Sequence, residues 1–363
     1  MNQFVVFTSM KLFQFPVFVL FLTLVVSSCN EDCDDTYDPT PYDLNIPPGL
    51  PPMEQFIPAD NPMTVEGVAL GRKLFYEPML SDDNSQSCSS CHLQENGFAE
   101  PQQFSIGIDG SVGNRNAMAL INLGWNQFGF FWDGGEETLE SQALKPVTNP
   151  IEMNTTWPEV EAKLNASEEY QTLFKEAYNV DYIDSLTVAK ALAQFERTLI
   201  SGNSRFDKWY NRQEIQLTEQ ETRGFVLYNG EEADCFHCHG LGGLITNNQY
   251  SNNGMDQVFQ DEGRYLVTGL EADKGKFRVP TLRNIAVTAP YMHDGRFFTL
   301  EQVIEHYSEH VDGASPNLDP NMELVGNGGA QLTPAEKADL LAFLRTFTDE
   351  EFLTNPDFSN PNP

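Results

Sequence analysis

Two short segments of the sequence place two cysteines three positions apart and a histidine directly after the second cysteine. These residues are Cys88, Cys91 and His92 in "CSSCH", and Cys235, Cys238 and His239 in "CFHCH". This spacing lets two thiols add to the two vinyl groups of one haem, while the adjacent imidazole lies under the iron as its proximal ligand. A redox pair or half of a zinc site would not need the trailing histidine. The sequence therefore predicts two covalently bound haem c groups, with His92 and His239 as proximal ligands.

The number of cysteines also allows a disulfide interpretation. The chain holds six cysteines, and an even number first suggests disulfides in an exported protein. The histidine that follows each closely spaced pair favours haem attachment instead. Cys33 is left over as an ordinary thiol near the N-terminus, and His237, inside the second motif, is more typical of a surface spacer than of a ligand.

A predicted helix and a loop precede each haem motif, which is how a cytochrome c domain begins. Thr64 is a candidate N-cap for the first helix, and Thr218 with Glu221 forms a capping box for the second. Closing helices are predicted over residues 186–200 and 332–347, each with apolar residues along one side. No run of alternating strand residues stands out. The sequence predicts an all-α fold of two cytochrome c-like haem domains with long loops.

Two longer stretches repeat one frame in the two halves. The stretch "WDGGEETLESQALKP" covers residues 132–146 and "HDGRFFTLEQVIEHY" covers residues 293–307, each with Asp-Gly near its start and Thr-Leu-Glu further on. The halves therefore look like copies related by internal duplication, with a boundary expected near residues 211–217. In this frame Trp132 occupies in one copy the place that His293 has in the other.

The last position of the repeat differs in its ability to bind a metal. Tyr307 stands where the first half has Pro146, and proline has no side-chain donor atom. A segment that returns over the far side of each haem would present a ligand to the second iron and none to the first. We therefore expect an open coordination position on the first iron and Tyr307 on the second. The rival ligands for the second iron are Met292, Met322, His306 and His310.

The N-terminus carries the pattern of a targeting segment. An apolar run over residues 12–26 follows Lys11; it is shorter than the ~20 residues needed to span a bilayer, and small residues follow it as before a cleavage site. The ending "VVSSC" is typical of a bacterial lipobox, with Cys29 as the lipidated first residue, and a plain secretory peptide is the alternative. Residues 30–52 are acidic and Pro-rich and predict a tether. We expect an exported protein of the periplasm or outer envelope, held at the membrane by lipid.

The chain is long and acidic. Its 363 residues are enough for two domains with full cores. The net charge of −32 argues against nucleic acid as a partner, because phosphate binding needs an excess of Lys and Arg. An acidic surface can steer a basic partner, although a solvated acidic face accounts for the charge equally well.

Several further motifs accompany the haem segments: "FFWDG", "NPIEMN", "FERTL", "RVPTLRN" and "PYMHDGRF". As a set they make residues 53–350 resemble the bacterial dihaem cytochrome c peroxidases and their MauG-type relatives, which finish a tryptophan-derived quinone in a partner protein. The resemblance implies an N-terminal haem domain over residues 53–212 that reacts with peroxide. It implies a C-terminal haem domain over residues 213–350 that delivers electrons. The other segments are then a signal peptide (1–29), the tether (30–52) and a tail (351–363).

The resemblance also implies roles for single residues. Trp132 in "FFWDG" would lie between the haems, Glu152 would be the distal acid-base residue, and Gln142 the glutamine near it. Taken alone, Glu152 is more often a surface or capping residue, and Trp132 a core residue. The resemblance further implies one calcium ion at the domain interface, because oxygen ligands suit a hard cation. Its ligands would be the Asn116 side chain and the backbone oxygens of Thr288 and Pro290.

The sequence departs from the ordinary peroxidase pattern at two positions. Peroxidases that need reductive activation carry a histidine that caps the first iron at rest, and here Ile108 stands at that place. Ordinary members carry methionine as the far ligand of the second haem, whereas Tyr307 stands here, as in MauG-type enzymes. A phenolate favours ferric iron and lowers the potential relative to a thioether. The resemblance thus implies a first haem that needs no prior reduction and puts simple electron delivery through the second in doubt.

The function predicted from these features is reduction of hydrogen peroxide to water at the N-terminal haem. Electrons would come through the C-terminal haem and Trp132 from a small redox protein, either a cytochrome c or a cupredoxin. One alternative is a MauG-like oxidase that modifies aromatic residues of a protein partner, which Tyr307 favours. Another is a non-enzymatic dihaem electron carrier. A carrier needs a sixth ligand on both irons, and the first half supplies none obviously.

Overall fold

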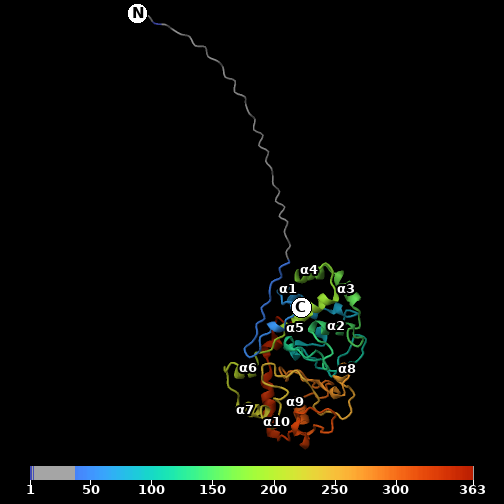
Figure 1. Ribbon diagram of the computed structural model, residues 1–363, viewed down its shortest axis with the longest axis vertical. Helices are drawn as coiled ribbons and strands as arrows, with labels where there is room; N and C mark the ends of the chain where they lie inside the picture. The colour runs from blue at the N-terminus through green and yellow to red at the C-terminus, as the bar shows by residue number, and fades with distance from the viewer. Residues whose placement is uncertain (2, 4–36, 363) are drawn as a thin grey trace. The chain divides into compact units, whose positions relative to one another are not determined.

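The structure is a computed structural model that describes residues 1, 3 and 37–362 (Figure 1). The predicted signal peptide and the lipidation site Cys29 lie outside the described residues. From Tyr37 onward the chain forms one compact unit. None of the described helices combines the length and the apolar character that a membrane crossing requires.

Helices make up most of the regular structure of this unit, as the sequence predicts (Figure 1). Two strands of two residues each pair antiparallel, with Tyr250 opposite Arg278. The helices are α1 (Val65–Phe75), α2 (Leu139–Thr148), α3 (Trp157–Asn165), α4 (Glu168–Tyr178), α5 (Ser185–Thr198), α6 (Arg205–Tyr210), α7 (Glu219–Tyr228), α8 (Tyr265–Thr268), α9 (Leu300–Glu309), α10 (Pro334–Leu344) and α11 (Glu350–Thr354), and the strands are β1 (Tyr250–Ser251) and β2 (Phe277–Arg278).

The first half is built around the crossing of α1 and α5. Thr64 caps α1 by accepting a hydrogen bond from the backbone of Gly67, as predicted. Gly71 lies where α1 meets α5: a Cβ atom there would come within 1.9 Å of the Ala191 carbonyl oxygen. Only glycine allows this close approach. One face of each helix enters a core that also holds α2, α3 and α4.

The second half repeats this arrangement with α7 and α10. Thr218 and Glu221 form the predicted capping box of α7. A Cβ atom at Gly224 would lie 2.0 Å from the Asp339 carbonyl oxygen of α10. Phe206 of α6 is fully buried in this second core, so α6 belongs to the second half by packing. The boundary between the two haem domains, expected at residue 212, stays a prediction.

Each half also carries a tight loop followed by a ten-residue helix. The backbone N–H of Phe130 donates to Glu136 O at 2.7 Å, and that of Tyr291 donates to Phe297 O at 2.7 Å. The loops lead into α2 and α9, which begin with the Thr138 and Thr299 capping boxes. The last-turn positions that the sequence repeat matched, proline in one and tyrosine in the other, are therefore equivalent in the two helices.

Part of the predicted tether is folded. The backbone of Tyr42 donates to Met63 O at 3.0 Å. Leu50 packs with Met53 and Trp125 in a small third core. The tether expected over residues 30–52 is thus not free from residue 37 onward, because its few apolar residues find a surface to bury against.

The predicted C-terminal tail is also folded. Helix α11 and the residues after it lie against the first half (Figure 1). Phe352 and Phe358 are buried, with their ring centroids 5.7 and 6.5 Å from that of Phe98. Arg72 of α1 donates to the backbone oxygen of Ser359 at 2.7 Å. The last residues of the chain therefore complete the core of its first half.

Candidate functional site

The first haem motif lies in a short 3-10 turn after α1. The backbone N–H of His92 donates to Cys88 O at 3.0 Å, which holds the imidazole beside the two thiols. The His92 Nδ1 lies 2.8 Å from the Phe98 carbonyl oxygen. That hydrogen bond fixes the tautomer and leaves Nε2 as the nitrogen that binds a metal. Burial lowers the pKa of His92, so the imidazole is neutral, the form that coordinates iron.

The second motif has the same backbone turn, but the Nδ1 of His239, unlike that of His92, has no hydrogen-bond partner among the described residues. The backbone N–H of His239 donates to Cys235 O at 2.9 Å. Burial lowers the pKa of His239 to about 4, and the backbone of Ile245 and Pro280 beside the ring opposes this in part. The cysteines of both motifs carry free thiols and form no disulfide. The donor set therefore fits two covalently attached haem groups.

A cavity of about 270 Å³ opens over the second motif. We call it the His239 cavity; it is lined mainly by apolar side chains. The residues that the sequence singled out on its wall are Cys235, Cys238, His239, Tyr307, Met292 and Met322. This arrangement, an apolar pocket with a few convergent polar groups, is typical of a cofactor site.

Tyr307 extends from α9 into the His239 cavity. Its hydroxyl accepts a hydrogen bond from Asn253 Nδ2 at 3.0 Å, and the same nitrogen lies 3.6 Å from Met292 Sδ. Burial raises the pKa of Tyr307 to about 12. Asn253 also faces His306, whose Nε2 lies 3.2 Å from the Asn253 carbonyl oxygen. Sequence reasoning missed Asn253, which holds three of the candidate ligands in place.

The rival ligands differ in their access to the cavity. Met292 and Met322 line it together with Tyr307. Among the described residues, His306 and His310 are not part of the lining. His306 is buried against Phe297, and His310 is exposed at the end of α9. The two histidines are therefore poorly placed as ligands of the second iron.

Trp132 also lines this cavity, and it is 9% exposed. Its Nε1 donates to Asn116 O at 2.8 Å, and its carbonyl oxygen accepts the backbone N–H of Arg278 at 2.8 Å. The Asn116 backbone in turn donates to His293 O at 2.8 Å. The His293 ring stacks on Phe277 with a centroid distance of 3.6 Å. Trp132 and His293, the two equivalent positions of the repeat, thus meet through one bridging residue.

The three residues expected to hold calcium also border this cavity. Asn116, Thr288 and Pro290 all belong to its lining. The Asn116 side chain donates through Nδ2 to Gln102 O at 2.9 Å. Because that bond uses the nitrogen, the amide oxygen remains as the group that a hard cation would bind. The donor chemistry of these residues fits the implied ion.

Glu152 lies close to the first motif, in the turn after α2. Burial is the main cause that raises the pKa of the Cys88 and Cys91 thiols. The charge of Glu152 raises both pKa values a little further, which places its carboxyl near the two thiols. Burial raises the pKa of Glu152 itself, and Asn149 Nδ2 donates to its Oε1 at 2.9 Å. The Ile108 backbone donates to Glu152 O at 3.1 Å. Ile108 is thus next to the candidate acid-base residue.

Gln142 lies on α2, ten residues before Glu152, and is half-buried. Within the described chain its side chain makes no hydrogen bond. Gln142 therefore lies on the helix before the turn that holds Glu152, but among the described residues no hydrogen bond joins the two side chains.

Two further carboxyls near the first motif escaped the sequence reasoning. Burial raises the pKa of Glu196 on α5 to about 8, and its charge acts on the Cys88 thiol. Burial also raises the pKa of Glu100, which accepts a hydrogen bond from Ser105 and acts on Cys91. The motif "FERTL" contains Glu196, but nothing in its sequence spacing indicates that it faces a haem motif. Three acids whose pKa values burial raises therefore lie near the first motif: Glu152, Glu196 and Glu100.

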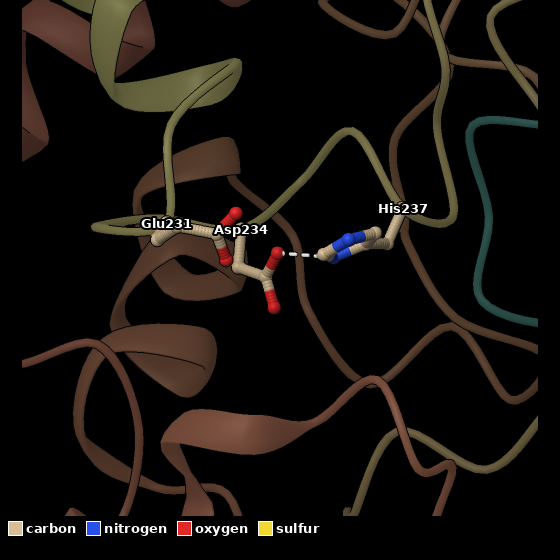
Figure 2. Close-up of side chains that lie close together, drawn as sticks. All are labelled: Glu231, Asp234 and His237. Carbon is tan, nitrogen blue, oxygen red and sulfur yellow. Dashed lines mark hydrogen bonds and ion pairs between the residues drawn. The ribbon is translucent and has the colours of Figure 1, made fainter.

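His237 is not part of the lining of the His239 cavity, and its side chain is about one third exposed. Figure 2 shows it next to Glu231 and Asp234, with Asp234 hydrogen-bonded to its Nδ1. The possible ligand atoms of the three lie within 4.8 Å of one another. This grouping agrees with the surface position expected for His237.

Comparison with known proteins agrees with this site. Over residues 65–215 the chain matches the family described as di-haem cytochrome c peroxidase. Cytochrome c551 peroxidase of Nitrosomonas europaea is 34% identical over 311 residues, which cover 85% of this chain and 86% of the relative. Methylamine utilization protein MauG of Methylorubrum extorquens is 34% identical over 296 residues, with 81% of each chain covered.

Solved structures share the fold. A MauG-like protein associated with microbial copper homeostasis superposes with a TM-score of 0.80 at 38% identity, covering 88% of this chain and 99% of that one. The diheme peroxidase BthA of Burkholderia thailandensis superposes with a TM-score of 0.72 at 23% identity, covering 82% of this chain and 90% of that one. The chain therefore belongs to the family of di-haem cytochrome c peroxidases and MauG proteins, and it is a peroxidase-type oxidoreductase with two haem groups.

Proposed function

We propose that the protein reduces hydrogen peroxide to water at the His92 haem, with electrons arriving through the His239 haem. When bound, the two haems supply the redox centres of this reaction. Each turnover takes two electrons and two protons per peroxide and gives two molecules of water. The observation that carries the proposal is the contact between Ile108 and Glu152, at 3.1 Å between backbone atoms. It pairs a side chain without donor atoms with a half-buried acid beside the first motif.

Glu152 would move the proton in this reaction. As a carboxylate it takes a proton from the inner oxygen of peroxide and returns it to the outer oxygen, which becomes the leaving water. Asn149 holds the carboxyl through the hydrogen bond to Oε1. Ile108 and Pro146 carry no side-chain donor atom with which they could compete with peroxide for the first iron. Gln142 would orient peroxide once it is bound.

Trp132 would carry electrons between the two haem sites. Its place on the wall of the His239 cavity and its hydrogen bond to Asn116 support this role. The equivalent loops and the two close glycine crossings support an origin of the halves by duplication. The donor would be a small redox protein, a cytochrome c or a cupredoxin, that meets an acidic surface.

We further infer that the protein works outside the cytoplasm, in the periplasm or outer envelope, with a lipid anchor on Cys29. A calcium ion held by Asn116, Thr288 and Pro290 would stabilise the region between the haem sites. Mass spectrometry of the mature N-terminus tests the anchor. Metal analysis after exhaustive chelation tests the ion.

Electron paramagnetic resonance of the fully oxidised protein tests the peroxidase proposal. One high-spin and one low-spin haem are expected, together with peroxide turnover by reduced cytochrome c without prior reduction of the enzyme. Two low-spin haems and no turnover would instead identify an electron carrier.

A second candidate function is oxidation of aromatic residues in a protein partner, as in MauG. The position of Tyr307 in the His239 cavity favours it. Tyr307→Phe and Met322→Leu variants decide which residue binds the second iron, because only loss of the true ligand changes the low-spin signal. Loss of cytochrome c peroxidation in the wild type, together with a long-lived oxidised state after peroxide addition, would favour this second function.

A further inference from the structure

Arg278 is a buried cation that lacks an anionic partner in the described chain. It lies in β2 and is 7% exposed. Among the residues that the structure describes, its Nε has no hydrogen-bond partner, and its Nη2 reaches only Asn248 Oδ1, at a long 3.5 Å. Its backbone is fixed by the pairing with β1 and by the hydrogen bond to Trp132 O. The backbone of Arg278 is thus fixed, while its guanidinium makes only one long hydrogen bond to the described residues.

Other buried arginines of this protein have carboxylate partners. Arg283 forms two hydrogen bonds of 2.9 Å with Asp207. Arg197 lies 2.8 Å from Glu140. By contrast, burial lowers the pKa of Arg278 to about 10, and Tyr250 is the neighbouring group that opposes this. A buried charge without a partner is costly, so its retention indicates that an anion comes from outside the chain.

The His239 cavity is where that anion would enter. Arg278 lines it together with Cys235, Cys238 and His239. His293, another buried member of the lining, has an Nδ1 without a partner. An arginine fork recognises carboxylates in particular, because two parallel N–H groups match two oxygens. A haem bound in this cavity brings two carboxylates of its own, on its propionate arms.

We propose that Arg278 binds a propionate of the haem attached at Cys235 and Cys238 and thereby raises the reduction potential of that haem. The proposal rests on the His239 site holding the second haem, and it does not depend on the direction of electron flow. A positive charge beside a haem favours the reduced state, which carries one positive charge less at the iron. Because the Arg278 backbone bonds to Trp132, the residue also fixes this haem relative to the tryptophan.

Potentiometric titration of the complete two-haem protein tests the proposal. In Arg278→Gln, the ratio of reduced to oxidised second haem at a fixed potential is expected to fall about tenfold, which is about 59 mV for one electron. Arg278→Lys should shift less, since it keeps the charge and loses the fork. The first haem should be unchanged in both variants.

Arg264→Gln is the matched control. Arg264 also lies beside Trp132's loop, where it donates to Asp133 O at 2.9 Å, but its guanidinium stacks on the Tyr250 ring at 3.9 Å. Arg264→Gln removes one positive charge, as Arg278→Gln does, but at a residue that does not line the cavity. A shift in Arg278→Gln no larger than that in Arg264→Gln would overturn the proposal.

A second measurement covers failure of Arg278→Gln to fold. The propionate bending bands of the resonance Raman spectrum should move in Arg278→Lys and stay in place in Arg264→Gln. Unmoved bands in Arg278→Lys would contradict the assignment. Both readouts are independent of peroxide turnover, so failure of the proposed enzymatic function would leave them interpretable.

Discussion

Glu152 combines burial with a position beside the first haem motif. Its carboxylate is the form that accepts a proton from peroxide, and burial raises its pKa. The acid limb of kcat/KM for peroxide should therefore lie above the ordinary range of a glutamate, with activity lost as the pH falls through the raised pKa. Glu152→Gln should lower kcat/KM by about 10²–10⁴-fold and abolish this limb. Steady-state kinetics from pH 4 to 8 measures both effects.

Glu176→Gln provides the control, because Glu176 is an exposed residue of α4. It should keep the wild-type rate and pH profile. An unchanged acid limb in Glu152→Gln would move the proton-transfer role to another acid, with Glu196 as the nearest buried alternative.

Ile108 allows a gain-of-ligand experiment. Its backbone bonds to the residue that would act on peroxide, so a histidine introduced there would lie next to Glu152, as a capping ligand of the first haem would. Ile108→His should convert the high-spin signal of the oxidised protein to a low-spin one and make turnover depend on prior reduction. Val112→His, on the exposed part of the same loop, should do neither. Persistence of the high-spin signal in Ile108→His would show that residue 108 lies outside ligand range.

At the residue scale, sequence alone predicted the groups that local spacing defines. The two Cys-x-x-Cys-His segments could be read directly, whereas the pairing of Pro146 with Tyr307 by duplication stays a prediction. Asn253 could not, because its bond to Tyr307 joins residues that are distant in the chain. Arg278 was part of a quoted motif, but its missing partner is visible only after folding.

The helix crossings make a prediction at the scale of elements. A methyl group at Gly224 would meet the Asp339 carbonyl oxygen at 2.0 Å and push α7 away from α10. Gly224→Ala should therefore lower the free energy of unfolding by about 1–3 kcal/mol. Gly242 has open space around its Cα, so Gly242→Ala serves as the control with little change. Thermal unfolding followed by circular dichroism compares the two, and equal stability would argue against a rigid crossing.

The helices themselves were predicted well where capping and apolar spacing agreed. Helix α10 lies within the closing helix predicted over residues 332–347: Thr333 caps it, and its apolar stripe is buried. Val65, an apolar residue next to the predicted cap Thr64, is 45% exposed. It lies in the first turn of α1, before the helix reaches its partner α5. Whether an apolar residue near a helix end is buried depends on where the two helices cross. The spacing of apolar residues in the sequence does not specify that point.

The C-terminal segment makes a prediction for the whole molecule. Phe352 is 3% exposed and packs on Phe98, far away in the sequence. Phe352→Ala should destabilise the first half by about 3–5 kcal/mol, since it leaves a cavity in the core. Phe298→Ala, at a ring that is 55% exposed, should cost little. Hydrogen exchange of α1 and α5 localises the effect, and protection equal to that of the wild type would show that the segment is dispensable.

The helical architecture of the whole molecule could be predicted from the sequence, but the packing of its two terminal segments could not. Two haem-binding halves built from helices follow from the motifs and their caps. The folding of residues 37–52 and of the residues after 350 against the body did not follow, because both stretches are short and largely polar. Their few apolar residues become decisive only when a matching surface exists.

The late contribution of Phe352 and Phe358 sets an order of events during biosynthesis. The ribosome must release nearly the entire polypeptide before the earlier half can acquire its final packing. Residues 352–358 therefore decide when the core around Phe98 can close.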